Sequence, residues 1–151
     1  MAENFKIRPA TWDDAKNIFD LSNDDVVRAN SIRREKIEWA SHLKWFASAL
    51  DNPDCAYFAA ECDGEFCGQI RFNRDGDDWV VSISVVGSFR GKRIGSRMLN
   101  SAIQKMLPKS VAAYVKSGNE ASLKMFSACG FLECSEKTID GEIYKFLRYA
   151  K

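Results

Sequence analysis

The scarcity of metal-binding side chains excludes several kinds of site at the outset. The chain has a single histidine, His42, and five cysteines with no C-x-x-C pair among them. Zinc sites need clusters of such ligands, and a disulfide framework in a small domain uses an even number of cysteines. We therefore expect no metal site, and reduced structural thiols at Cys55, Cys62, Cys67, Cys129 and Cys134.

Long apolar segments are also missing. No apolar run approaches the roughly 20 residues that a membrane-spanning helix needs, and the first residues, MAENFKIRPA, lack the apolar core of a signal peptide. Linkers, repeats and low-complexity segments are absent as well. The sequence predicts one globular domain over residues 1–151, located in the cytoplasm.

Acidic residues are absent from residues 79–119. The segment carries seven of the 22 Lys and Arg residues, so the rest of the chain has 15 cations against 21 Asp and Glu. The seven cations are Arg90, Lys92, Arg93, Arg97, Lys105, Lys109 and Lys116. A basic segment in an otherwise acidic chain indicates a local anion site, whereas a nucleic-acid-binding protein is usually basic throughout.

Hydrophobic periodicity and turn residues predict a mixed α/β (α+β) chain. Strands are expected at 5–10, 55–62, 65–74, 79–86, 111–115, 131–140 and 141–149, and helices within 11–23, 35–53, 94–107 and 119–131. The Pro residue at 108 ends the third helix. The β-α-β order around residues 79–115 implies a parallel pair at the centre of the sheet, with antiparallel hairpins at both ends.

The segment SVVGSFRGKRIGSRML, residues 84–99, joins a predicted strand to a predicted helix. Glycines let a ligand approach the backbone, and a helix N-terminus offers unpaired N–H groups with a partial positive charge. Together with four cations, these features favour a phosphate or pyrophosphate site. The glycine spacing excludes a Walker A loop and a G-x-G-x-x-G dinucleotide motif.

Two motifs resemble those of the GNAT superfamily of acetyl-CoA-dependent N-acetyltransferases. The family motif [Q/R]-x-x-G-x-[G/A], which follows a strand, is similar to residues 90–95, RGKRIG, after the strand ISVV. A second motif, N-x-x-[A/S] on a helix that ends in an aromatic residue and Gly-Phe, is matched by Asn119, Ser122, Phe126, Gly130 and Phe131. The resemblance implies a mixed, mostly antiparallel sheet with helices on both faces and a parallel pair around the CoA site.

The resemblance also implies how acetyl-CoA binds. The strand backbone holds the pantetheine arm, the turn amides cradle the pyrophosphate, and the second helix forms the other wall. The expected cofactor-binding residues are Ile83, Val85, Val86, Arg90, Gly91, Lys92, Arg93, Ile94, Gly95, Ser96, Asn119, Ser122 and Phe126. Arg93 replaces the first glycine of the motif, and we expect it to offer its N–H in a helical conformation. Phe126 replaces a tyrosine that protonates the leaving thiolate in many members.

Attack of an amine on the thioester needs a base, an oxyanion donor and an acid. We expect the amide near Val85 or Val86 to be the oxyanion donor. The catalytic side-chain candidates are Ser84 as the acid and His42 as the base. Open alternatives are a water molecule, Tyr114 or Tyr144 for the acid, and Asp77, Asp78 or Glu61, acting through water, for the base.

Residues 25–46, DVVRANSIRREKIEWASHLKWF, resemble a GNAT subgroup that acetylates nucleotide-activated deoxyamino sugars for surface polysaccharides. This resemblance implies a 4-amino group as acceptor, with Arg28, Asn30, Ser31, His42 and Trp45 contacting phosphate, hydroxyls and base. A protein N-terminus, a lysine or another small-molecule amine is an alternative acceptor, and an RNA-binding or adaptor module is the non-enzymatic alternative. We expect a monomer or homodimer, with neither a membrane nor a nucleic acid as partner.

Overall fold

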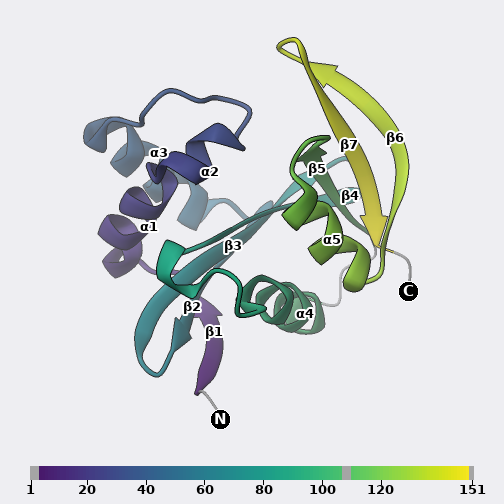
Figure 1. The fold of residues 1–151 in the computed structure, drawn as a ribbon. Helices are drawn as coiled ribbons and strands as arrows, with labels where there is room; N and C mark the ends of the chain where they lie inside the picture. Colours follow the sequence, from purple (N-terminus) through teal and green to yellow (C-terminus); the bar gives the residue numbers. More distant parts are fainter. Residues whose placement is uncertain (1–3, 107–109, 150–151) are drawn as a thin grey trace.

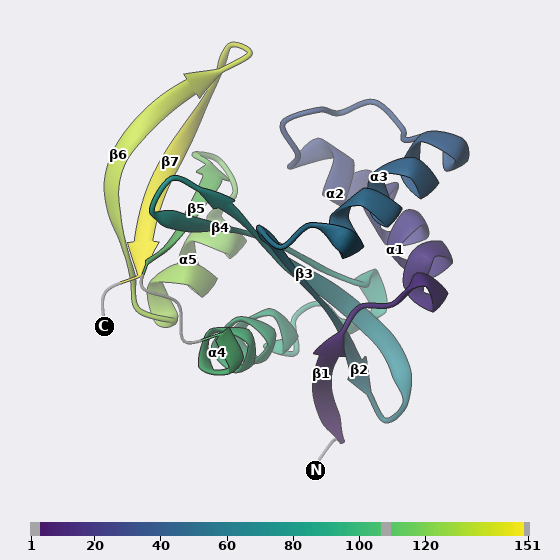
Figure 2. The same cartoon turned by 180° about the vertical axis from the view of Figure 1, so that it is seen from behind.

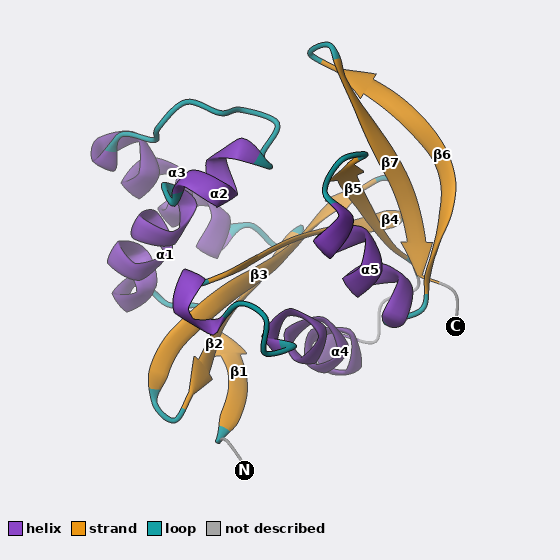
Figure 3. Ribbon diagram, in the orientation of Figure 1, coloured by secondary structure: helices purple, strands orange, loops and turns teal. Residues whose placement is uncertain are grey.

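The computed structural model describes residues 4–106 and 110–149 (Figures 1 and 3). In chain order, the elements are β1 (Phe5–Pro9), the 3-10 helix η1 (Trp12–Asp14), α1 (Ala15–Ser22), α2 (Asp25–Ala29), α3 (Trp39–Asp51), β2 (Cys55–Cys62), β3 (Glu65–Asp75), β4 (Asp78–Val85), the 3-10 helix η2 (Gly87–Phe89), α4 (Ile94–Met106), β5 (Val111–Lys116), α5 (Glu120–Ala128), β6 (Phe131–Ile139) and β7 (Glu142–Tyr149). Leu107, Pro108 and Lys109, which the sequence places at a helix end and in the basic segment, lie outside the described residues.

The strands form one seven-stranded sheet in the order β1-β2-β3-β4-β5-β7-β6. β4 and β5 are parallel, and the other neighbouring pairs are antiparallel. The parallel pair is the one predicted, because α4 is the crossover that a parallel connection requires. The predicted fold class, a mixed and mostly antiparallel sheet with a central parallel pair, is confirmed.

Helices cover both faces of the sheet, as expected (Figures 1 and 2). α4 and α5 pack on one face over the larger apolar core, which includes Phe72 and Met98. α1 and α3 pack on the other face over a smaller core, which includes Ile18 and Phe46. The predicted apolar stripe is the buried side of α4, formed by Ile94, Met98, Leu99, Ala102 and Ile103. This stripe fixes the N-terminus of α4 against the sheet and so positions the basic turn.

α2 is a helix that the sequence does not predict. Its first turn is capped by Asp24, whose carboxylate accepts hydrogen bonds from the amides of Val26 and Val27 at 3.0 and 3.2 Å. The helix has only five residues, so it shows no repeat of apolar positions. Its stability depends on this cap and on the contacts of the loop that follows it.

α3 begins at Trp39, four residues later than the predicted start at residue 35. The preceding residues form a loop that Asn23 holds to the end of α1. The Asn23 side chain accepts from the Ile37 amide at 2.7 Å and donates to the Ile37 carbonyl at 2.9 Å. These bonds satisfy backbone groups that a longer helix would otherwise pair.

Gly68 marks a close approach of β3 to β4. A Cβ atom at this position would lie 2.6 Å from the Ser84 carbonyl oxygen and 2.9 Å from Met98 Sδ. Gly68→Ala therefore displaces the β4 backbone, and we expect it to lower the free energy of unfolding by about 1–3 kcal/mol in chemical denaturation. Gly118→Ala is the control, because a Cβ there meets nothing within 4 Å. Equal losses for the two variants would contradict this account.

Candidate functional site

β4 and β5 diverge after a short parallel contact. Their register pairs residues 79–80 with residues 111–112 and, within the described strands, extends no further. β4 nevertheless continues to Val85, and β5 continues to Lys116. The edge of β4 that faces β5 is therefore without a strand partner over its last residues. We refer to residues 83–85 on this side of β4 as the divergent edge.

The orientation of the β4 backbone follows from two hydrogen bonds. The Val86 amide donates to the Cys67 carbonyl of β3 at 2.8 Å, and the Trp79 amide donates at 2.8 Å to the segment before β5. The N–H and C=O groups of successive residues point to alternate sides of a strand. The N–H and C=O groups of Ile83 and Val85 therefore point away from β3 and into the divergent edge. We expected the Val86 backbone to donate to the oxyanion or to contact a ligand in this edge. That expectation is wrong, because the Val86 amide already donates to β3.

The basic turn follows the divergent edge directly. η2 leads into residues 90–93, and α4 then begins at Ile94, whose side chain is buried. Gly91 has a φ of 78°, a conformation that glycine adopts without strain. The first N–H groups of α4 have no partner within the helix and carry partial positive charge. An anion at this helix end would meet backbone donors and cationic side chains together.

The cations of the turn differ in their partners. Arg90 Nη2 lies 2.9 Å from Asp24 Oδ2, the residue that caps α2. Burial raises the pKa of Asp24, but the hydrogen bonds from Arg90 and the α2 amides lower it below its usual value. Lys92 and Arg93 are exposed and, in the described part of the chain, have no ion-pair partner. The charges of Lys92 and Arg93 are therefore available to a ligand, whereas Arg90 connects the turn to the start of α2.

Arg93 adopts the left-handed conformation, with a φ of 61°. The prediction of a helical conformation at this residue is therefore wrong. A left-handed backbone costs a residue with a Cβ atom roughly 1–2 kcal/mol, which gives a physical reason for glycine at this position of the motif. The Arg93 side chain is exposed one residue before α4, so its charge remains available at the helix N-terminus.

Substitutions of Arg93 separate backbone strain from charge. Arg93→Gly and Arg93→Ala both remove the guanidinium, but only glycine also removes the Cβ that disfavours the left-handed backbone. We expect the glycine variant to be more stable than the alanine variant by about 1 kcal/mol in chemical denaturation. Both variants should bind CoA equally in calorimetry. Equal stabilities would mean that residue 93 is not left-handed in solution.

α5 packs beside α4, and its first residues are those that the sequence predicts for the second wall of the site. Asn119 is its N-cap, and its Oδ1 accepts a hydrogen bond of 3.3 Å from the Ser122 amide. Phe126 is buried, and its ring packs edge-on against Phe131 with 5.0 Å between ring centroids. Asn119 and Ser122 thus lie together at the start of α5, while Phe126 is part of the larger core.

Residues proposed to bind the acceptor lie on α2, on the loop after it and on α3. Arg28 donates to two carbonyls of the 31–38 loop and, at 3.2 Å, to Ser31 Oγ. Ser31 and Asn30 in turn bond to carbonyls of α2. Trp45 lies on α3 and is 41% exposed. Arg28 and Ser31 are therefore brought together and shape the loop, whereas Asn30 makes only a local contact.

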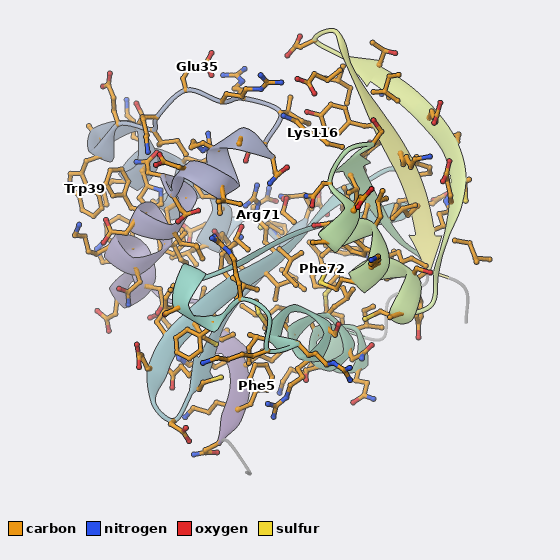
Figure 4. The ribbon with its side chains drawn as sticks, viewed as in Figure 1. Phe5, Glu35, Trp39, Arg71, Phe72 and Lys116 are labelled. Carbon is orange, nitrogen blue, oxygen red and sulfur yellow. The ribbon has the colours of Figure 1, made fainter. Side chains whose placement is uncertain are left out.

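A cleft of about 840 Å³ opens between the 31–38 loop and the β6–β7 turn. Arg34 and Glu142 form an ion pair that joins its two sides. Lys116, at the end of β5, is 7% exposed and donates to the Ala29 carbonyl at 2.7 Å (Figure 4). Burial and the nearby Arg34 lower the pKa of Lys116. Lys116 thus joins the end of β5 to α2, and Arg28 of α2 lines the cleft.

His42 lies in the smaller core. It is 2% exposed, and its Nε2 is 2.9 Å from the Ala15 carbonyl oxygen. Its ring packs between aromatic neighbours, with centroids 5.6 Å from Phe46 and 5.8 Å from Trp39. Burial lowers the pKa of His42, which favours the neutral imidazole in this cluster, although the hydrogen bond to Ala15 opposes the shift. This packing role replaces the general-base and substrate-binding roles expected from the sequence.

Ser84 lies on β4 beside the divergent edge. Its Oγ accepts a hydrogen bond of 3.2 Å from Gln69 Nε2 of β3. Asp78 and Glu61, two of the carboxylates considered as bases, are each held by an arginine at 2.9 Å. Asp77 lies in the exposed β3–β4 turn, at the opposite end of β4. Of the catalytic candidates on β4, Ser84 is therefore the one at the divergent edge.

Sequence reasoning missed Arg71 and its neighbour Gln69 on β3. Arg71 lies opposite Tyr57 of β2 and Ser82 of β4 in the sheet. Its guanidinium carbon is 5.0 Å from the centroid of the Trp45 ring. The sequence does contain a signal, since two polar residues alternate with apolar ones in QIRF. Such alternation in a strand at the middle of a sheet indicates a polar site on one face.

Residues 15–131 match the family model described as the Acetyltransferase (GNAT) family. The matched range contains the divergent strands, the basic turn and α5. The chain belongs to the GNAT acetyltransferase family. The resemblance inferred from the two sequence motifs is confirmed, and so is the enzyme class, an acyltransferase. Family membership favours the enzyme over the RNA-binding or adaptor alternative.

Solved structures of several acetyltransferases share this fold. A ribosomal-protein-alanine N-acetyltransferase from Brucella melitensis has a TM-score of 0.82 and 21% identity, covering 95% of this chain and 98% of its own. Spermidine N-acetyltransferase from Vibrio cholerae, in complex with CoA and spermine, has a TM-score of 0.81 and 14% identity over 95% and 94%. An aminoglycoside acetyltransferase in complex with coenzyme A has a TM-score of 0.83 and 12% identity over 98% and 95%. None of the curated proteins matches the chain by sequence.

Within residues 4–106 and 110–149, no group of three or more His, Cys, Asp and Glu side chains is placed to hold a metal ion. No helix in these ranges is long and apolar enough to cross a membrane. The five cysteines are free thiols.

Proposed function

We propose that this GNAT protein transfers the acetyl group of acetyl-CoA to a primary amine. The observation that carries the proposal is the divergent edge of β4, which leads directly into a basic turn and a helix N-terminus. The amides of a pantetheine arm suit the free backbone groups of Ile83 and Val85, and a pyrophosphate suits the amides and cations of residues 90–96. We assign Asn119 and Ser122, at the start of α5, to the second wall of this site. Two of the GNAT structures compared above contain CoA, which supports the same cosubstrate here.

The backbone of β4 supplies the oxyanion donor in this proposal. Acetyl-CoA provides an acetyl group activated as a thioester, and its carbonyl oxygen gains negative charge when an amine attacks. A fixed N–H aimed at that oxygen stabilises the developing charge without reorganising during the reaction. The Val85 amide is directed into the divergent edge and is free of β3. We therefore assign this role to Val85.

A proton donor for the leaving thiolate must come from a residue other than Phe126, which has no hydroxyl. We propose Ser84, because its Oγ accepts from Gln69 and its own proton is therefore free for another acceptor. Tyr144 is the second candidate. Burial raises the pKa of Tyr144, so its hydroxyl keeps its proton at neutral pH, but it lies on β7 rather than on β4.

We propose the 4-amino group of a nucleotide-activated deoxyamino sugar as the acceptor. Residues 25–46, which resemble the sugar-acetylating subgroup, form α2, a loop along the cleft and the first half of α3. The half-exposed Trp45 ring offers a stacking surface, and Arg28 offers positive charge beside Ser31. Five free thiols support a reducing, cytoplasmic setting for the reaction.

Calorimetry and a thiol-release assay test the proposal together. We expect saturable binding of acetyl-CoA and amine-dependent release of free CoA thiol. The amine panel consists of a nucleotide-linked 4-amino sugar, spermidine, an aminoglycoside and a peptide with a free N-terminus. Absence of binding at high micromolar acetyl-CoA would refute the assignment of residues 83–96. Faster release with another amine of the panel would replace the sugar by that acceptor class.

A further inference from the structure

We propose that a cluster of polar side chains on the sheet face covered by α1 and α3, which we call the arginine pocket, binds an anionic group of the amine acceptor, a carboxylate or a phosphate. This arginine pocket is formed by Arg28, Tyr57, Gln69, Arg71 and Ser82. The inference rests on the proposed acetyl transfer and adds the charge that the acceptor carries.

Three buried polar atoms of the arginine pocket find no hydrogen-bond partner in the described part of the chain. They are Arg28 Nε, the Tyr57 hydroxyl, which the Arg71 side chain approaches, and Gln69 Oε1. Tyr57 is 7% exposed and Gln69 is 3% exposed, so their side chains are buried. Leaving a buried donor or acceptor without its bond is costly, and native proteins seldom do so. A ligand that accepts from Arg28 and Tyr57 and donates to Gln69 would supply the missing bonds.

Arg28 and Arg71 bring two positive charges to the pocket. Both are half-buried, and neither has a carboxylate within ion-pair distance among the described residues. Arg71 lies against the Trp45 ring, and its Nε is 3.3 Å from Asn73 Oδ1. Burial lowers the pKa of Arg28, Glu35 partly opposes this, and the charge of Arg71 lowers it further. An anion between the two guanidiniums relieves their repulsion and replaces the lost hydration.

The arginine pocket lies next to the proposed reaction centre. In the register of β3 and β4, Arg71 is opposite Ser82 and Gln69 is opposite Ser84. Two residues along a strand span roughly 7 Å, so an anion at Arg71 and an amine at Gln69 Oε1 can belong to one small molecule. The amine is then beside Ser84 and the divergent edge. A polycation such as spermine would instead meet two like charges.

Binding of simple anions to the CoA-saturated protein tests the arginine pocket. Saturating CoA occupies the basic turn, so calorimetric titration with pyrophosphate or glutarate reports on the remaining anion site. We expect one-to-one binding of at least one anion, weakened about 10- to 100-fold by Arg71→Gln. Arg71→Lys should lose less anion affinity than Arg71→Gln, because lysine keeps the positive charge although it lacks the planar guanidinium that binds an anion through two N–H groups. Arg74→Gln, on the same strand, is the matched control and should leave the affinity unchanged.

The outcomes separate this inference from the proposed function. Binding of pyrophosphate points to a phosphate-bearing acceptor and binding of glutarate to a carboxylate-bearing one, and either result supports the pocket. If CoA binds but neither anion does, or if Arg71→Gln and Arg74→Gln lose affinity equally, the pocket is refuted while the proposed function stands. If CoA itself does not bind, the proposed function falls and this inference with it. Circular dichroism of each variant verifies that it is folded.

Discussion

Val85→Pro will lower kcat/KM for acetyl transfer by about 10²- to 10³-fold, the loss typical of removing one oxyanion donor. Proline has no N–H, and the Val85 amide is the donor that we assign to the developing oxyanion. The ladder between β3 and β4 keeps its bonds, because the neighbouring Val86 amide donates to Cys67. Steady-state thiol release with the best amine of the panel measures the effect.

Val85→Ala is the matched control for this substitution. It retains the amide and shortens a side chain that is only partly buried against the larger core, so we expect a much smaller loss of rate. Thermal unfolding and CoA affinity of both variants distinguish a lost donor from a damaged strand. If a folded proline variant keeps the rate of the alanine variant, the Val85 amide does not stabilise the oxyanion.

The parallel pair at the centre of the sheet was predictable because it depends on local information. Apolar periodicity marks each long element, and a β-α-β sequence fixes a parallel connection without knowledge of distant contacts. α2 lacks both signals. It has five residues and is stabilised by the Asp24 cap and by Arg28, whose hydrogen bonds shape the following loop. Contacts of this kind form between segments and leave no pattern within either one.

The basic turn was predictable in composition but not in conformation. Glycines and cations before an apolar stripe identify an anion site, yet the left-handed backbone of Arg93 depends on how the turn meets α4. The choice of Val85 over Val86 depends on the register of β3 and β4, because a shift of one residue exchanges the two edges. Arg71 was overlooked for a similar reason, since its role depends on strands and helices that meet only in the folded chain.

An Arg8→Met substitution is expected to lower the free energy of unfolding by about 3 kcal/mol, the lower end of the range for breaking a buried ion pair. Arg8 Nη1 and Nη2 each lie 2.8 Å from an oxygen of Asp14, which is 3% exposed. When the Arg8 guanidinium is removed, the buried Asp14 carboxylate keeps its hydrogen bond from the Thr11 amide at 2.8 Å. The lower end applies because the Arg8 side chain is 34% exposed.

Lys6→Met is the control for this substitution. Lys6 is an exposed cation 3.8 Å from Glu61, and its replacement should change the free energy of unfolding by about 0.5 kcal/mol or less.

The Arg8→Met substitution is also expected to reverse the contribution of Asp14 to the pH dependence of stability. Burial alone raises the pKa of Asp14, but hydrogen bonds from Arg8 and the Thr11 amide outweigh it and lower the pKa below 3.8. This contribution is fully present above the unfolded-state pKa and is lost as the pH falls through the lower folded-state pKa. In Arg8→Met, burial dominates and raises the folded-state pKa of Asp14. The contribution of Asp14 to stability then becomes more favourable as the pH falls from neutral through this raised pKa. Thermal unfolding from about pH 3 to pH 7 measures both proteins. Parallel curves would show that Arg8 is not what keeps Asp14 ionised.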